Sequence, residues 1–184
     1  MKGFTRTTLA AMLIATGVLS APSQGAPPAL TALASAADAK VSPSVKSELT
    51  GTWTLDYADV IHPDGSRGHD YGEKPIGILI IDASGNYSQQ IFDTARPKFA
   101  AAEKAKGTEE EYKAATIGAS SHFGTIAVDT ATHIITFNLV GSTYPNQEGS
   151  TRKIPYTLSN GLLVNKSPAR ANGDVPVTEW KRLP

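Results

Sequence analysis

The sequence predicts an all-β domain, an antiparallel barrel or sandwich of about eight short strands with one short helical insertion between the third and fourth strands. Apolar and polar residues alternate with a period of two from Gly51 onward. Turn-forming residues separate the successive apolar segments, and the period changes only once, between Asp93 and Ala115. A chain of 184 residues is long enough to bury a single core after loss of a targeting segment.

The N-terminal residues have the composition of a secretory signal peptide. Lys2 and Arg6 precede a short apolar run over residues 9–19, and small residues follow it. The run is shorter than the roughly 20 apolar residues that span a bilayer. We therefore predict a secreted or periplasmic protein with no stable membrane insertion of the mature chain. The expected division is a signal peptide over 1–26 with cleavage between 25 and 36, a flexible linker over 27–47, and a folded domain over 48–184.

The first three strands are separated by turns with recognisable chemistry. The first runs from Leu49 to Ile61 and ends at His62-Pro63-Asp64-Gly65, where Pro and Gly favour a turn. A polar segment over residues 66–74 is expected to lie over an open end of the domain. Ile76–Ile81 is so uniformly apolar that we expect it to be buried on both faces, and an Asp-Ala-Ser-Gly-Asn turn leads into Tyr87–Phe92.

A helical insertion follows the third strand. Thr108 stands three residues before Glu111, the spacing of a capping box at a helix N-terminus. The acidic run Glu109–Glu111 suits the positive end of a helix dipole, so we interpret it as a solvated first turn and not as a metal site. Five further strands are expected after the insertion, over residues 122–128, 133–140, 151–158, 162–166 and 175–183.

Composition excludes several classes of function. The chain has 17 basic and 17 acidic residues, so it lacks the basic surface that binds nucleic acid. It has no Cys, which excludes disulfides, thiolate metal sites and Cys nucleophiles. No two of its four His residues stand at a metal-binding spacing, and no phosphate-binding or dinucleotide motif is present. We expect neither a metal nor a cofactor.

Several short motifs follow one another along the predicted domain. They are Leu49–Leu55 with Gly51-Thr52-Trp53, Gly85–Ile91, Arg96-Pro97, Gly107–Tyr112, Phe123-Gly124-Thr125, Ser142 with Tyr144-Pro145-Asn146 and Gly149, and Arg152 with Tyr156. In this order they resemble the bacterial lipocalin-like domain family, a group of up-and-down β-barrels. The resemblance implies an antiparallel up-and-down barrel of about eight strands. The chain departs from the family pattern at Gln147, where an aromatic residue often follows the Pro-Asn pair.

The resemblance also implies a structural floor made by Gly51, Trp53 and Arg182. In lipocalins an Arg from the last strand covers the Trp of the Gly-x-Trp opening. A guanidinium within about 6 Å of the indole centroid would stabilise the closed end. Trp180 lies two residues before Arg182 and is expected on the same face of the strand.

Polar residues interspersed among the apolar strand positions suggest a ligand site. The candidates are Gln90, Arg96, His122, Tyr144, Asn146, Arg152 and Tyr156. Arg152 and Tyr156 are four residues apart and are expected to share one face of a strand with Ile154. If they face inward, they would suit a small hydrophobic molecule with a carboxylate or carbonyl head, and if they face outward they are surface residues.

Three functions are compatible with these residues. The first is an exported protein that holds a small hydrophobic ligand in a barrel, at the mouth opposite Trp53 and beneath the helical insertion and the Tyr144-Pro145-Asn146 loop. The second is an isomerase or cyclase in which His122 moves a proton, the one catalytic residue we can name. It requires His122 to face a cavity near Arg152 or Tyr156. The third is a structural or interaction module with no ligand and a filled core.

Overall fold

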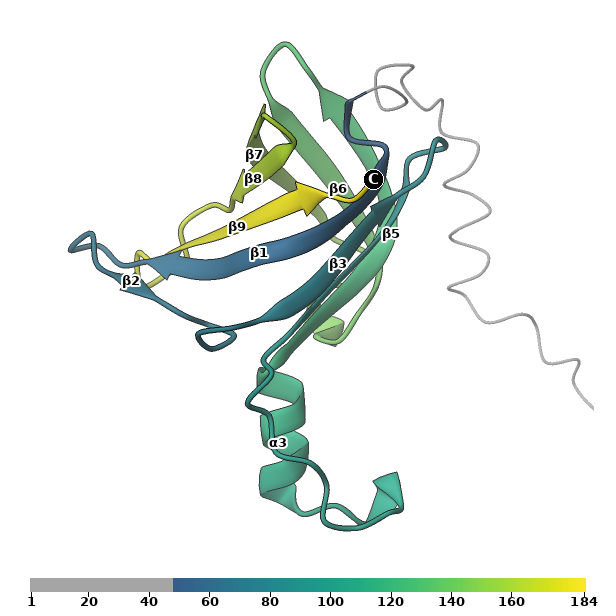
Figure 1. Ribbon diagram of the computed structural model, residues 1–184, viewed down its shortest axis with the longest axis vertical. Coiled ribbons are helices and arrows are strands. Elements are labelled where there is room, and N and C mark those ends of the chain that lie inside the picture. Colours follow the sequence, from purple (N-terminus) through teal and green to yellow (C-terminus); the bar gives the residue numbers. More distant parts are fainter. Residues whose placement is uncertain (1–47) are drawn as a thin grey trace, which may run out of the picture.

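A computed structural model describes residues 48–184, which form a closed antiparallel barrel with one helical insertion (Figure 1). The predicted signal peptide and linker lie outside the described residues. The elements in chain order are β1 (Gly51–Ile61), β2 (Arg67–Gly68), β3 (Ile76–Ile81), β4 (Asn86–Phe92), η1 (Lys104–Lys106), α3 (Glu109–Ile117), β5 (Ala119–Asp129), β6 (Ile134–Ser142), η2 (Pro145–Gln147), β7 (Thr151–Ser159), β8 (Leu162–Lys166) and β9 (Val175–Arg182).

The barrel closes because β1 pairs with strands on both of its sides. From β3 to β9 each strand pairs with the next one in the chain, and β9 then pairs with β1. Trp53 lies opposite Leu79 of β3 on one side and opposite Arg182 of β9 on the other. Eight strands form the closed sheet, and the two-residue β2 extends one end of β1. The predicted up-and-down barrel is confirmed, and the sandwich alternative is excluded.

The expectation that β3 is buried on both faces is wrong. Leu79 and Ile81 face the core and are almost inaccessible, whereas Ile76 is 57% exposed and Ile80 is 43% exposed. A strand in a single-layer barrel has one face toward the interior and one toward solvent, whatever its composition. The outer face of β3 is therefore an apolar surface.

The helical insertion lies where the sequence predicts it, between β4 and β5. Thr108 caps α3, and both hydrogen bonds of the capping box with Glu111 are present. None of the residues of α3 is buried, and the helix projects away from the barrel (Figure 1). The insertion is therefore an appendage that contributes little to the core.

Trp53 forms the centre of the closed end of the barrel. Its side chain is fully buried, and its Nε1 donates a hydrogen bond to the Leu49 carbonyl at 3.0 Å. The guanidinium carbon of Arg182 lies 4.0 Å from the centroid of the Trp53 ring, within the limit set above for a stack. Arg182 also donates to the carbonyls of Thr50 and Glu48, so it ties the entry of β1 to the end of β9.

Gly51 allows this arrangement. Its φ of +142° is one that side chains rarely adopt, and a Cβ here would lie 2.8 Å from a guanidinium nitrogen of Arg182.

A bulge in β6, with Val140 as its extra residue, faces a second glycine, Gly124 of β5. The register between β5 and β6 shifts between Phe123 and Gly124, which brings the Asn138 carbonyl close to the glycine. A Cβ on Gly124 would lie only 2.0 Å from the Asn138 carbonyl oxygen. The alternation of inward and outward residues continues unbroken along β5, so His122, Gly124 and Ile126 share its inner face.

We expect Gly124→Ala to lower the free energy of unfolding by about 1–3 kcal/mol, because the backbone must shift to accept the methyl group. Urea unfolding measures this change. Ala127→Ser, on an exposed position of the same strand, is the control and should change stability by less than about 0.5 kcal/mol. Equal effects of the two substitutions would contradict the role of Gly124.

Candidate ligand-binding site

The barrel contains a half-open cavity of about 310 Å³ at the end opposite Trp53. This volume is at the lower limit of small-molecule sites, which occupy roughly 300–1,000 Å³. More of the lining side chains are polar or charged than apolar. The lining residues are Ala58, Asp59, Asp70, Tyr71, Gln89, Ile91, Ser120, His122, Phe137, Leu139, Gln147, Arg152, Ile154, Asn165, Ser167, Pro168, Arg170, Pro176 and Thr178.

The apolar part of the wall comes from β6 and β7. Phe137 and Leu139 are buried inward-facing residues of β6, and Ile154 is their counterpart on β7. Each is separated from the next inward residue by one outward residue, as the pleat of a strand requires. These side chains provide a surface for the hydrocarbon part of a ligand.

His122 lies in the wall as a neutral, fully hydrogen-bonded side chain. It is 7% exposed, with Nδ1 3.0 Å from the Tyr87 hydroxyl and Nε2 3.2 Å from the Gln89 amide nitrogen. Burial, and secondarily the positive charge of Arg152, lowers the pKa of His122 to about 4. Because both ring nitrogens have partners, His122 is a rigid polar part of the wall.

Arg152 is the unpaired charge of the cavity. Four lining residues carry full charges at neutral pH, namely Asp59, Asp70, Arg152 and Arg170. Asp59 pairs with Arg67 at 3.0 Å and with His69 at 2.9 Å, and Asp70 pairs with Arg170. Arg152 has no hydrogen-bond or ion-pair partner within residues 48–184, so the described cavity has an excess of positive charge.

Asn165 lies deep in the cavity on β8. It is 6% exposed, and its Oδ1 is buried without a hydrogen-bond partner among the described residues. The next inward residue toward the floor, Leu163, is fully buried and pairs with Trp180. A polar side chain therefore stands just above an apolar floor.

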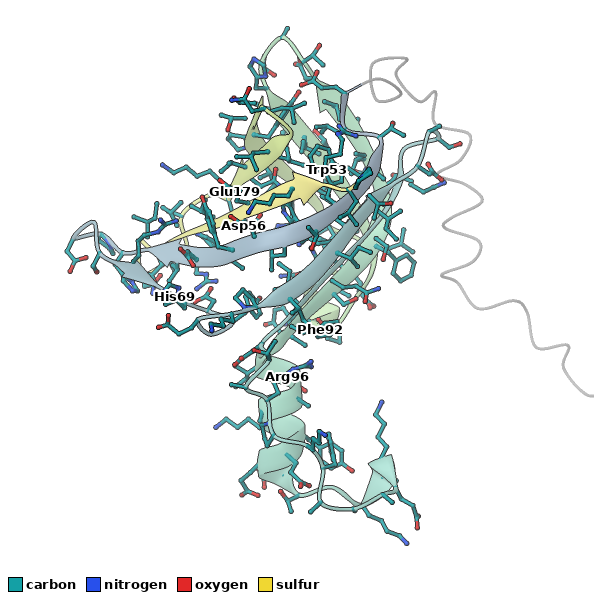
Figure 2. All side chains as sticks on the ribbon, in the orientation of Figure 1. Trp53, Asp56, His69, Phe92, Arg96 and Glu179 are labelled. Atoms are coloured by element: carbon teal, nitrogen blue, oxygen red, sulfur yellow. The ribbon has the colours of Figure 1, made fainter. Side chains whose placement is uncertain are left out.

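Two loops form the mouth of the cavity. The segment over residues 66–74, which was expected over the open end, contributes Asp70 and Tyr71 to the lining, and the segment over 167–174 contributes Arg170. The ion pair between Asp70 and Arg170 joins the loops, and His62 pairs with Asp174 at 2.8 Å. Figure 2 shows His69, in the first loop, at the opposite end of β1 from Trp53.

The structure brings two of the seven predicted ligand-binding residues to the cavity. His122 and Arg152 both line it. Gln90 is on the outward-facing side of β4, and its neighbour Gln89 lines the cavity instead. Tyr156 faces inward but belongs to the core, where its hydroxyl donates to the Glu48 carboxylate at 3.2 Å.

The other three predicted residues lie away from the cavity. The Arg96 guanidinium stacks on Phe92 at 4.5 Å, at the junction of the barrel and the insertion (Figure 2). Tyr144 is 57% exposed and its hydroxyl accepts a hydrogen bond from Asn146, which is also exposed. Arg96 precedes the helical insertion and Tyr144 and Asn146 lie at the η2 loop, and none of the three lines the cavity.

Sequence reasoning missed Gln89, Asn165 and Thr178 as lining residues. The alternation of side chains along the strands could have identified Gln89 and Asn165. Gln89 lies two residues from both Tyr87 and Ile91, and Asn165 lies two residues after Leu163. Each therefore shares its face of the strand with a large apolar residue. A polar residue on the apolar face of a barrel strand is a candidate cavity residue.

Within residues 48–184 no group of three or more His, Asp or Glu side chains is arranged to hold a metal ion. The same residues include no helix with the length and apolar character needed to cross a membrane.

A family model described as a lipocalin-like domain matches residues 50–182. The chain belongs to this lipocalin-like family. No curated protein and no solved structure gave a significant match.

The lipocalin-like barrel of this chain has its mouth covered by loops. No residue of α3 lines the cavity, so the expectation of a site beneath the helical insertion is wrong. Because α3 buries none of its residues and projects from the barrel, it does not cover the mouth of the cavity (Figure 1). Gln147, the position at which the chain departs from the expected motif, is part of the lining, and its Oε1 accepts a hydrogen bond from Ser142 at 3.3 Å.

Proposed function

We propose that this lipocalin-like protein is an exported carrier that binds one small organic acid with an apolar body in the barrel cavity. Arg152 would receive the acid group, and the wall of Phe137, Leu139 and Ile154 would cover the hydrocarbon part. The family and the closed barrel support ligand binding in general. The signal-like composition of residues 1–26 supports export to a secreted or periplasmic location.

The unpaired Arg152 carries this proposal. Because Asp59 and Asp70 are already paired with cations, neither carboxylate neutralises Arg152. A guanidinium in a half-enclosed site favours a carboxylate, which it can bind through two parallel hydrogen bonds. An acidic ligand would supply the missing negative charge.

His122 is better suited to holding the wall than to catalysis. It faces the cavity with Arg152, as an isomerase or cyclase would require. However, both of its nitrogens are engaged, and a pKa of about 4 makes it a weak base near neutral pH. We therefore favour ligand binding over catalysis as the function of this cavity.

Titration with decanoic acid tests the proposal. We expect wild-type protein to bind the acid and Arg152→Ala to bind it about 10–100-fold more weakly, because a charge-assisted hydrogen bond is lost. Isothermal titration calorimetry measures the affinity. Native mass spectrometry of protein purified from its own host would show whether an acid is retained.

Lys153→Ala is the matched control. Lys153 has the same charge on the next position of β7 but is exposed on the outer face. Its removal should leave the affinity unchanged. Equal loss in both variants would indicate a nonspecific charge effect, and full binding by Arg152→Ala would contradict the proposed site.

A further inference from the structure

The deepest polar groups of the cavity come from β8 and β9. Asn165 lies directly opposite Thr178 in the register of these strands, and both line the cavity. One inward position below them, Leu163 and Trp180 are fully buried and close the floor. Asn165 and Thr178 are therefore the last polar side chains that a ligand meets as it enters.

Both side chains have unused hydrogen-bonding capacity. Asn165 Oδ1 is buried with no donor within residues 48–184. Thr178 Oγ1 accepts a hydrogen bond from the Trp180 indole at 3.0 Å, so its own proton remains for another acceptor. A buried carbonyl oxygen without a donor is destabilising, whereas a group that both donates and accepts would satisfy the pair.

The chemical group that fits this pair is a hydroxyl. It can donate its proton to Asn165 Oδ1 and accept the proton of Thr178 through its oxygen. A carboxylate cannot donate to Asn165, and a hydrocarbon can do neither. The floor is thus chemically distinct from the cationic part of the wall at Arg152.

The register also separates the two polar subsites. Asn165 lies opposite Tyr156 on β7, and Arg152 is four residues farther along that strand. This offset corresponds to roughly 13 Å between backbone positions, part of which the long Arg side chain can span. A ligand that reaches both subsites needs several carbon atoms between its two polar groups.

We propose that Asn165 and Thr178 form a second subsite that recognises a hydroxyl group, so that the ligand is a hydroxy acid with the hydroxyl several carbon atoms from the carboxylate. The carboxylate of this ligand is the acid group that the proposed function assigns to Arg152, so the inference rests on that proposal. It assigns Asn165 as a residue that determines specificity, in a site where Arg152 provides affinity for the anion.

Three probes of nearly equal size test the inference. They are decanoic acid, hydroxydecanoic acid with the hydroxyl beside the carboxylate, and hydroxydecanoic acid with the hydroxyl at the chain end. We expect wild-type protein to bind the chain-end isomer at least about tenfold more tightly than decanoic acid. Asn165→Leu should bind all three acids within about twofold of one another.

Controls separate recognition from folding. Asn165→Ala is a second variant that adds no bulk if the Leu side chain does not fit. Asn138→Leu changes an exposed Asn on the outer face of β6 and should keep the wild-type preference. Urea unfolding of each variant would show that the barrel is intact.

The outcomes distinguish the two proposals. If decanoic acid binds through Arg152 but the chain-end isomer gains nothing, the hydroxyl subsite is refuted and the proposed function stands. Persistence of the preference in both Asn165 variants would also refute it. If none of the acids binds to wild-type protein, both proposals fail together.

Discussion

Replacement of Trp53 by Ala is expected to lower the free energy of unfolding by about 3–5 kcal/mol, the usual cost of removing a fully buried large aromatic side chain. Trp53 has no exposed surface, bonds to the Leu49 carbonyl, and is covered by the Arg182 guanidinium. The substitution would leave a void at the closed end and remove the surface on which Arg182 stacks. Urea unfolding with linear extrapolation measures the loss.

Phe123→Ala provides the comparison. Phe123 is also aromatic, but it lies on the outer face of β5 and is 39% exposed. We expect a loss of about 1 kcal/mol or less. Similar losses for the two variants would mean that the floor has no special role in stability.

Acidification is expected to destabilise the protein through His122. The pKa of His122 is lowered to about 4 in the folded state, from 6.5 for an unperturbed imidazole. Between these two values the unfolded chain takes up a proton that the folded chain excludes. The stabilisation is therefore complete above pH 6.5 and decreases as the pH falls toward 4, by about 3 kcal/mol.

The comparison of two variants isolates this effect from the titration of carboxylates. His122→Gln keeps a hydrogen-bonding amide but cannot titrate, so its stability should fall less than that of wild type between pH 7 and 4. His133→Gln removes an exposed imidazole from the turn before β6 and should retain the wild-type slope. Parallel curves for wild type and His122→Gln would refute the assignment.

The barrel could be predicted largely because its signals are local. The turn residues and alternating strands fix most strand boundaries to within a few residues, and the Thr108 capping box locates α3. The outer face of β3 could not be predicted, because solvent exposure of Ile76 and Ile80 depends on what lies beyond the sheet. Nothing in their own residue types distinguishes an inner from an outer face.

The site was harder to predict than the fold. The sequence predicted Gln90 as a ligand-binding residue, but its neighbour Gln89 lines the cavity. Adjacent residues of a strand point to opposite faces, so an error of one residue assigns the wrong face. Arg96 and Tyr144 lie in an insertion and a loop, whose orientation relative to the barrel depends on tertiary packing. Arg152 could be found because its spacing from Tyr156 places it on a buried face, although only the structure shows that it lacks a partner.

The pairing of β1 with β9 has a consequence for how the protein is made. The two strands are separated by more than a hundred residues, so β1 is synthesised long before the strand that covers its second edge. Until β9 emerges, the growing sheet has open hydrogen-bonding edges at β1 and at the newest strand, and such edges promote association with other chains. Arg182 near the end of β9 completes both the sheet and the cover of Trp53. We therefore expect unfinished chains to associate most readily just before the last strand is added.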